Sequence, residues 1–309
     1  MSLKDKLRSL GPNFDKLDEL TIVTGILVNV SPLRIGKGKS ELGEPTELSI
    51  EKLPDGTPYV PGSSLKGALR SLAEKLAKSS GHKICNIFMD LTPCELAAAI
   101  TRKALDAIES LSIKPLKHDL VDILSRAKRT SEEIRELANS IENIVNEIQD
   151  TSDLENAIEK IMEELKELPC PVCRIFGNKE LASHVRIMNA YPKDEAKPEL
   201  QFRTRVALDR FRKASRSGAL FDYEFVPPGY KWDFEMRIYN LNILEPNEDQ
   251  ASKLLKHVLD YVSNLGLEIG GMKSVGHGLI KFEELKAKVY HIKDFKVELM
   301  KEVNLFERH

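Results

Sequence analysis

The chain has 309 residues, of which 41% are hydrophobic and 30% charged, so it can bury a sizeable core and remain in solution. No apolar run approaches the roughly 18–20 residues that a membrane span needs, and the charged segment from Met1 to Glu19 lacks the pattern of a signal peptide; a membrane protein is excluded and the cytoplasm is the expected location. The net charge of −2 hides a segregation, because Ser131 to Glu167 holds twelve acidic residues against three basic ones, while Gln201 to Gly218 holds six basic residues against Asp209 alone.

The first part of the chain predicts a strand followed by a helix. Leu20 to Val30 alternates as a strand does, and one of its faces is formed by Ile22, Ile26, Val28 and Val30. A Gly- and Lys-rich loop over 34–47 and a turn at Pro54-Asp55-Gly56 come next. Leu65 to Lys78 has leucines at helical spacing, and Pro61-Gly62-Ser63-Ser64 marks the start of this helix.

The middle of the chain predicts a helical region. Apolar residues recur at three- and four-residue spacing between Cys94 and Leu168. Thr130-x-x-Glu133 and Ser152-x-x-Glu155 have the spacing of capping boxes. The acidic excess falls on the outer faces of these helices, which favours a solvated surface.

Strand signals return after Gly177. The expected strands are His184 to Ala190, Phe202 to Leu208, Phe221 to Phe225, Tyr230 to Tyr239 and Leu279 to Phe282. An amphipathic helix, Asp249 to Leu265, precedes the last of them. This order predicts an α+β fold of the ferredoxin-like type, with a core formed by 20–93 and 169–300 and an inserted helical subdomain at 94–168.

Several segments have the composition of phosphate-binding sites. The loop from Gly270 to Gly278 holds four glycines, which let backbone N–H groups approach a phosphate, and its alternative is an ordinary glycine turn. The helix start at 61–64 offers free N–H groups beside two basic side chains. The basic segment 203–216 predicts a hairpin that binds RNA or DNA, and its tip, called the hairpin tip below, consists of Arg210, Arg212, Lys213 and Arg216. The RNA-binding candidates are Arg34, Lys37, Lys39, Ser63, Ser64, Lys66, Arg70, Arg203, Arg205, Arg210, Arg212, Lys213, Arg216, Gly270, Gly271, Lys273, Ser274, Gly276 and Gly278.

The four cysteines are candidate metal ligands. Cys170-Pro171-Val172-Cys173 places two thiols on one tight turn, which is half of a zinc site. Cys85 and Cys94 can complete a structural zinc site, with His82 as a substitute ligand; the alternative is that all four are ordinary thiols. A redox role is disfavoured, because no thioredoxin-like βαβ pattern surrounds the pair.

Catalytic motifs are scarce. Neither G-x-S-x-G nor H-E-x-x-H occurs in the chain. Glu41, Glu44 and Glu47 form a carboxylate cluster in the loop beside basic residues. Such a carboxylate can hold a divalent ion or take the proton of an RNA 2′-OH, and the alternative is a solvated surface.

Four segments of the chain carry a family resemblance: Pro58 to Gly67, Cys170 to Gly177, Gly218 to Glu224 and Gly270 to Gly278. They resemble the RAMP superfamily, and in their order along the chain they are similar to the repeated backbone subunit of type III (Csm/Cmr) CRISPR effector complexes. The resemblance covers about Leu20 to Phe282 and implies an RRM-like RAMP core, with the basic hairpin as a thumb between base-paired segments. It also implies binding of guide crRNA and target RNA, and assembly with further copies or paralogues and other effector subunits in antiviral defence.

One position departs from the family pattern. Catalytic members carry an Asp before the hairpin, commonly as Asp-x-Pro-Val, whereas this chain has Glu47 near that place, within Pro45 to Ile50. Glutamate moves the carboxylate by about 1.5 Å, enough to disturb an in-line attack. The sequence therefore predicts a guide-RNA-binding structural subunit. The alternatives are a metal-dependent RAMP endoribonuclease with Glu47 as catalytic residue, and an unrelated metal-stabilised interaction module, which leaves the basic hairpin unexplained.

Overall fold

The structure is a computed structural model that describes residues 16–37, 48–86, 89–193, 197–208 and 215–306, together with Leu3, Lys4 and Leu7, with the backbone alone at 207–208 and 215–220. The chain forms two compact units. The helical unit consists of 1–17, 74–184 and 247–254, and the sheet unit consists of 18–73, 185–246 and 255–309. Two helices, α2 (Gly62–Ser79) and α8 (Gln250–Asn264), contribute residues to both.

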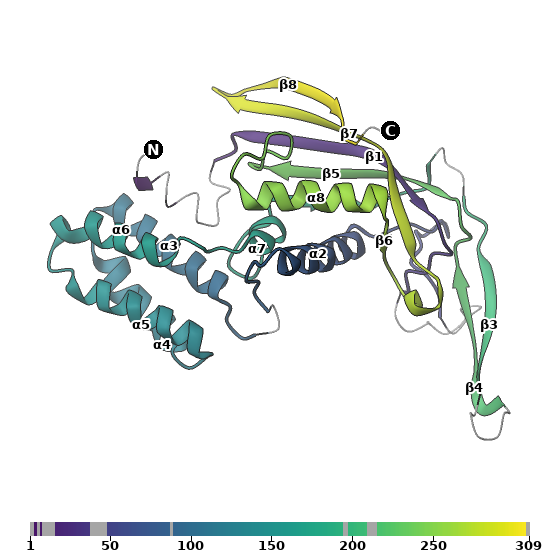
Figure 1. The fold of residues 1–309 in the computed structure, drawn as a ribbon, viewed down its shortest axis with the longest axis horizontal. Helices are drawn as coiled ribbons and strands as arrows, with labels where there is room; N and C mark the ends of the chain where they lie inside the picture. The colour runs from purple at the N-terminus through teal and green to yellow at the C-terminus, as the bar shows by residue number, and fades with distance from the viewer. Residues whose placement is uncertain are drawn as a thin grey trace. The chain divides into compact units, whose positions relative to one another are not determined.

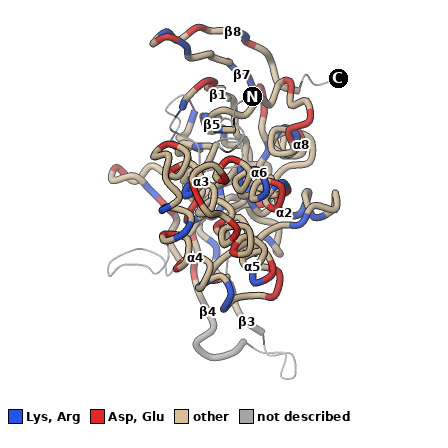
Figure 2. Tube along the Cα trace, turned by 90° about the vertical axis from the view of Figure 1, so that its left-hand side faces the viewer, with Lys and Arg blue, Asp and Glu red and all other residues tan. Residues whose placement is uncertain are grey.

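The helical unit confirms the predicted run of helices (Figure 1). Its helices are α3 (Pro93–Ser110), α4 (Leu120–Ala127), α5 (Glu132–Glu147), α6 (Leu154–Glu164) and α7 (Pro171–Phe176), with a π-helical turn at Pro115–Asp119 and a 3-10 turn at Thr151–Asp153. Their apolar side chains form a core of their own, which includes Leu96, Leu120, Ile134, Ile141 and Ile158. The acidic residues of α5 and α6 are not buried, in agreement with the predicted outer faces. Figure 2 shows where acidic residues lie along the backbone of these helices.

The two capping-box predictions are wrong. The residue before α5 is Ser131, whose side chain makes no capping hydrogen bond. The box before α6 joins Asp150 to Asp153, two residues earlier than the spacing suggested. Both segments offer several Ser, Thr and Asp residues in succession, so the local pattern does not distinguish which of them begins the helix.

The sheet unit is built on one antiparallel sheet in the order β2-β5-β1-β7-β6, with β8 paired to β7. Its strands are β1 (Glu19–Asn29), β2 (Val185–Ile187), β5 (Lys231–Tyr239), β6 (Leu267–Glu268), β7 (Leu279–Lys293) and β8 (Lys296–Asn304). A separate antiparallel pair, β3 (Gln201–Leu208) with β4 (Ser215–Phe225), forms the expected hairpin (Figure 1). The molecule is thus an α+β protein with antiparallel sheets.

The face of β1 that was expected to be buried is the less buried of the two. Val23 and Leu27, on the other face, are completely buried, while the predicted face is mixed: Ile26 is buried, Ile22 and Val28 are half-buried, and Val30, just after the strand, is 46% exposed. The residues of α2 and α8 that are buried in the sheet unit include Leu65, Leu69, Leu255 and Leu259. Alternation predicts a strand, but it does not predict which face the helices cover.

The C-terminal hairpin was not expected from the sequence. β7 extends well beyond Phe282, and β8 pairs with its second half although every described residue of β8 except Val303 is exposed. Since both faces of β8 are open, this strand lacks the alternation that marks a half-buried strand. None of the described helices is both long enough and apolar enough to span a membrane.

Candidate functional site

The loop after β1 and the glycine-rich loop before β7 are joined by backbone hydrogen bonds. The Gly271 N–H donates to the Arg34 carbonyl at 2.9 Å, and the Gly278 N–H donates to the Pro32 carbonyl at 2.8 Å. Gly270 has a φ of +77°, and a Cβ there would lie 2.2 Å from the Arg34 carbonyl oxygen. Only glycine permits this contact, so the glycines let two backbone segments touch.

The same hydrogen bonds limit what the glycine-rich loop can offer a phosphate. The N–H groups of Gly271, Gly276 and Gly278 all donate to backbone carbonyls of this protein. The side chains of Lys273 and Ser274, in contrast, are exposed. Any contact between this loop and an anion therefore depends more on these two residues than on the glycine N–H groups.

Arginines on β3 lie over aromatic rings on β4. The Arg203 guanidinium is 5.6 Å from the centre of the Phe225 ring, and that of Arg205 is 5.4 Å from the centre of the Tyr223 ring. His277 contacts the same rings edge-on, and its Nε2 lies 3.4 Å from the Tyr223 hydroxyl. These cation–π contacts hold the two guanidinium groups in place without neutralising them.

Arg34, in the loop after β1, acts electrostatically on His277, as Arg203 and Arg205 do. It is only 9% exposed, and a Cβ at Gly36 or Gly271 would lie 3.2 or 3.0 Å from its Nη1. Its Nε is buried without a hydrogen-bond partner, and among the described residues its guanidinium forms no ion pair. Burial lowers the pKa of Arg34, and the nearby Tyr223 and Glu224 partly offset this. We call Arg34, Arg203 and Arg205 the arginine cluster.

Glu224, a described carboxylate that acts electrostatically on Arg34, already has hydrogen-bond partners. Glu224 is 1% exposed and accepts hydrogen bonds from the Lys52 ammonium at 2.6 Å and the Ile50 N–H at 3.2 Å. Burial lowers the pKa of His277, and the positive charges of the cluster lower it further. A hydrogen bond with the Val275 backbone raises this pKa and offsets part of the effect. The cluster is therefore an excess of positive charge that attracts anions.

The start of α2 is capped by the side chain of a residue that is far away in the sequence. The Asn189 side chain accepts a hydrogen bond from the Gly62 N–H at 2.9 Å, over a sequence separation of 127 residues, so no local pattern announced this cap. Ser63 is exposed and Ser64 half-buried. Burial, followed by repulsion from Arg70, lowers the pKa of Lys66.

The remaining candidates fall partly outside the description. Lys37 is exposed. Arg216 lies on β4, where only the backbone is described. The candidates outside the described residues are Lys39, Glu41, Glu44, Glu47, Arg210, Arg212 and Lys213.

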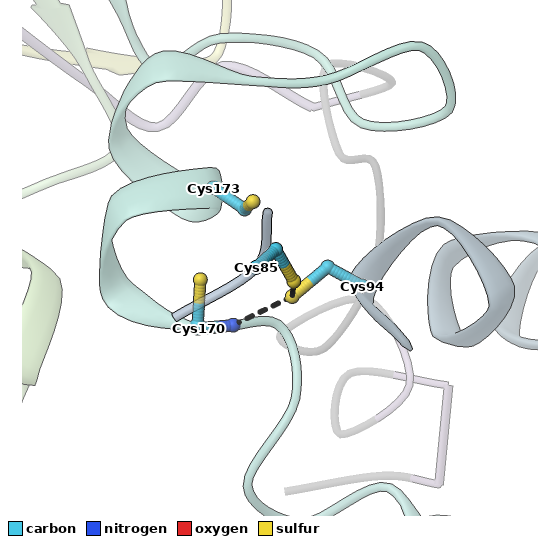
Figure 3. A group of neighbouring side chains, drawn as sticks. All are labelled: Cys85, Cys94, Cys170 and Cys173. Atoms are coloured by element: carbon cyan, nitrogen blue, oxygen red, sulfur yellow. Dashed lines mark hydrogen bonds between the residues drawn. The ribbon is translucent and has the colours of Figure 1, made fainter. Parts of the chain in front are cut away.

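The four cysteines meet in the helical unit (Figure 3). Their Sγ atoms all lie within 4.8 Å of one another, and the group does not include His82. Cys94 is the second residue of α3, whose start is fixed by a capping box between Thr92 and Glu95. Cys170 is the residue before α7 and Cys173 lies one turn further on, so both thiols lie on the side of α7 that faces Cys85 and Cys94.

The cysteine geometry fits tetrahedral coordination of a metal ion. Metal–thiolate bonds of about 2.3 Å place the sulfurs about 3.8 Å apart, and here Cys85 and Cys94 are 3.1 Å apart with no pair beyond 4.8 Å. The Cys170 N–H donates to the Cys94 sulfur at 3.1 Å. Hydrogen bonds with the other thiols, chiefly that of Cys173, lower the pKa of Cys170. Hydrogen bonds with the other thiols, chiefly that of Cys170, together with burial raise the pKa of Cys94. All four thiols can ionise together only around a cation.

The chain is similar to known proteins over most of its length. A family model of the RAMP superfamily matches residues 27–281. A curated protein, the CRISPR system Cmr endoribonuclease Cmr4 of Pyrococcus furiosus, is 26% identical over 292 residues, which cover 82% of this chain and 92% of that protein. The matched region contains the arginine cluster and all four cysteines.

Proposed function

Since the chain belongs to the RAMP superfamily, we propose that it is a guide-RNA-binding structural subunit of a type III CRISPR ribonucleoprotein, which helps to present the guide to target RNA in antiviral defence. The observation that carries this proposal is the arginine cluster, in which three guanidinium groups have no carboxylate partner among the described residues. Such an excess of fixed positive charge suits a polyanion, while base pairing with the guide supplies sequence specificity.

The proposed core is ferredoxin-like. In support of it, β1, α2, β2, β5, α8 and β7 follow one another in βαββαβ order, and the sheet order β2-β5-β1-β7 is the one that this topology forms. The core would then comprise 20–93 and 169–300, the helices of 94–168 would be an insertion between α2 and β2, and the β3–β4 hairpin would be the thumb. The partners would be further copies or paralogues of this chain and other effector subunits.

We place structural zinc at the four cysteines. Four sulfur ligands with little room for a water molecule suit a closed structural site rather than a catalytic one. The ion would join the start of α3, the start of α7 and the loop that contains Cys85. No step of RNA binding depends on it.

The second candidate is a metal-dependent RAMP endoribonuclease, and the similarity to the Pyrococcus protein, which is named an endoribonuclease, favours it. Glu47 is the candidate carboxylate in this chain. We expect Glu47→Ala to leave cleavage of complementary RNA nearly unchanged in single-turnover assays of the assembled complex. A loss of about 10²-fold or more at unchanged RNA binding would make this chain the nuclease.

The proposed function is tested on protein purified from its own cells. Native mass spectrometry should show several subunits on RNA of uniform, short length, and protein without RNA would overturn the proposal. The purified chain should also bind single-stranded RNA, and R203Q/R205Q should weaken this binding. The matched control is R102Q/K103Q, which removes two positive charges from α3 and should change the affinity little.

A further inference from the structure

The burial of Arg34 is not explained by any hydrogen bond or ion pair among the residues that the structure describes. The residue is 9% exposed, and its Nε is buried with no hydrogen-bond partner in that part of the chain, although almost every arginine that is removed from water is paired. The carboxylate of Glu224, which acts electrostatically on Arg34, is held by Lys52 and the Ile50 N–H. An unpaired guanidinium in this position indicates a ligand that supplies the missing acceptor.

The surroundings of Arg34 favour an oxyanion as this ligand. Arg203 and Arg205 add positive charge, and no ion pair neutralises either of them in the part of the chain that the structure describes. The Nη1 of Arg34 lies where a side chain at Gly36 or Gly271 would crowd it, so the two glycines leave the space that this end of the guanidinium occupies. A guanidinium with free terminal nitrogens can bind a phosphate through two parallel hydrogen bonds.

We infer that Arg34 is a preformed anchor for one phosphodiester group of the RNA backbone, and that the free protein holds it unpaired at a loss of stability. This inference rests on the proposed RNA-binding function. It predicts two opposite effects of one substitution: without the guanidinium, RNA binding weakens and the free protein becomes more stable. A lysine or arginine on an open surface does not produce this combination, because its charge remains hydrated.

The test compares Arg34→Met with wild type and with the control Arg237→Met. Arg237 is an arginine of the same unit, but its side chain is 40% exposed and forms an ion pair with Glu235. The affinity for a fluorescein-labelled single-stranded RNA of about 30 nucleotides is measured by anisotropy at several salt concentrations. The melting temperature of each full-length protein is measured without RNA, in chloride and in inorganic phosphate of equal ionic strength.

We expect Arg34→Met to weaken RNA binding about 10-fold or more, to reduce the slope of log K against log salt by about 0.7, and to raise the melting temperature in chloride by about 2 °C or more. Arg237→Met should change the affinity less than about 3-fold. If wild type binds RNA and Arg34→Met binds it like Arg237→Met, the anchor is refuted while the proposed function stands. Wild type that binds no RNA refutes both.

Two further outcomes also decide the inference. A lower melting temperature of Arg34→Met would show that the guanidinium stabilises the free protein, and the inference would be wrong. Because a poorly folded variant would lose RNA binding for another reason, Arg34→Lys is measured as well; it retains the charge and should recover part of the salt dependence. If phosphate stabilises wild type but not Arg34→Met, and RNA affinity is unchanged, the site binds free phosphate and the RNA assignment is overturned.

Discussion

Removal of the proposed zinc should destabilise the helical unit without unfolding the sheet unit. The proposed zinc would link Cys94 to Cys170, which are 76 residues apart in the chain. A cross-link that closes such a loop contributes about 4–5 kcal/mol to stability by reducing the entropy of the unfolded chain. The helical unit also has an apolar core of its own, so it should remain folded at moderate temperature, unlike a zinc finger. For a unit of this size, the loss corresponds to a melting temperature lower by about 10–20 °C.

The assay separates the two units by their spectroscopic signals. Trp232 is the one tryptophan of the chain and is buried in the sheet unit, so its fluorescence follows that unit, while circular dichroism at the helical band is dominated by the helices. Chelator should shift the helical transition more than the fluorescence transition. Cys173→Ser should melt like the chelated wild type and should not respond to chelator. Protein that was never exposed to chelator yet contains no metal, or a Cys173→Ser transition within about 2 °C of wild type, would refute the zinc site.

Three further predictions concern the sheet unit and the hairpin tip. The folded state lowers the pKa of His277, so the unfolded state binds protons more readily, and the free energy of unfolding should fall as the pH drops below the unfolded pKa of about 6.5. His277→Gln should flatten this decline when it is measured by urea unfolding, and a decline equal to that of wild type would contradict the prediction. Gly62→Ala should destabilise the protein by about 1–3 kcal/mol, because the new Cβ would lie 2.2 Å from the Ile187 carbonyl oxygen. Gly67→Ala, in open space on the same helix, should instead stabilise the protein by up to about 1 kcal/mol, and urea unfolding of both variants tests this contrast. Replacing the hairpin tip by alanine should weaken RNA binding and flatten its salt dependence by about 0.7 for each lost phosphate contact, and an unchanged slope would show that the tip does not bind RNA.

The elements that the sequence predicts well are those whose signal is periodic and local. Helical spacing located the bundle of the helical unit, and alternation located β1 and β5. The hairpin of β3 and β4 was predicted from charge and strand signals together. In each of these cases, residues close in sequence carry the information that determines the element.

The failures have the opposite character, because they depend on contacts that are distant in sequence or weak in pattern. The cap of α2 comes from Asn189, and the covered face of β1 is decided by helices that follow much later. β8 has charged and apolar residues on two open faces, so hydrogen bonding to β7 defines it and hydrophobic burial does not. A true capping box, Thr92 with Glu95, was present in the sequence but was overlooked beside Cys94.

The candidate site shows the same division. The spacing Cys170-x-x-Cys173 predicted a shared ligand position, and the structure brings Cys85 and Cys94 to it, as expected from their chemistry. Basic residues were predicted to bind RNA from their number, but composition could not distinguish a hydrated charge from an unpaired one. That distinction needs the fold, since it is the packing of Arg34 against Gly36 and Gly271 that keeps it from water.

This packing gives the glycine-rich loop a role different from the one its composition suggests. Gly270 accommodates the Arg34 carbonyl and Gly271 leaves space for the guanidinium, so both glycines act on Arg34 before they act on any ligand. A side chain at either position would shift the arginine, and at Gly270, whose φ is +77°, it would strain the backbone as well. If substitutions of Gly270 or Gly271 change RNA binding, they should therefore do so by displacing the buried guanidinium of Arg34. These effects should be lost when Arg34 is already replaced, because two changes that act through one residue do not add.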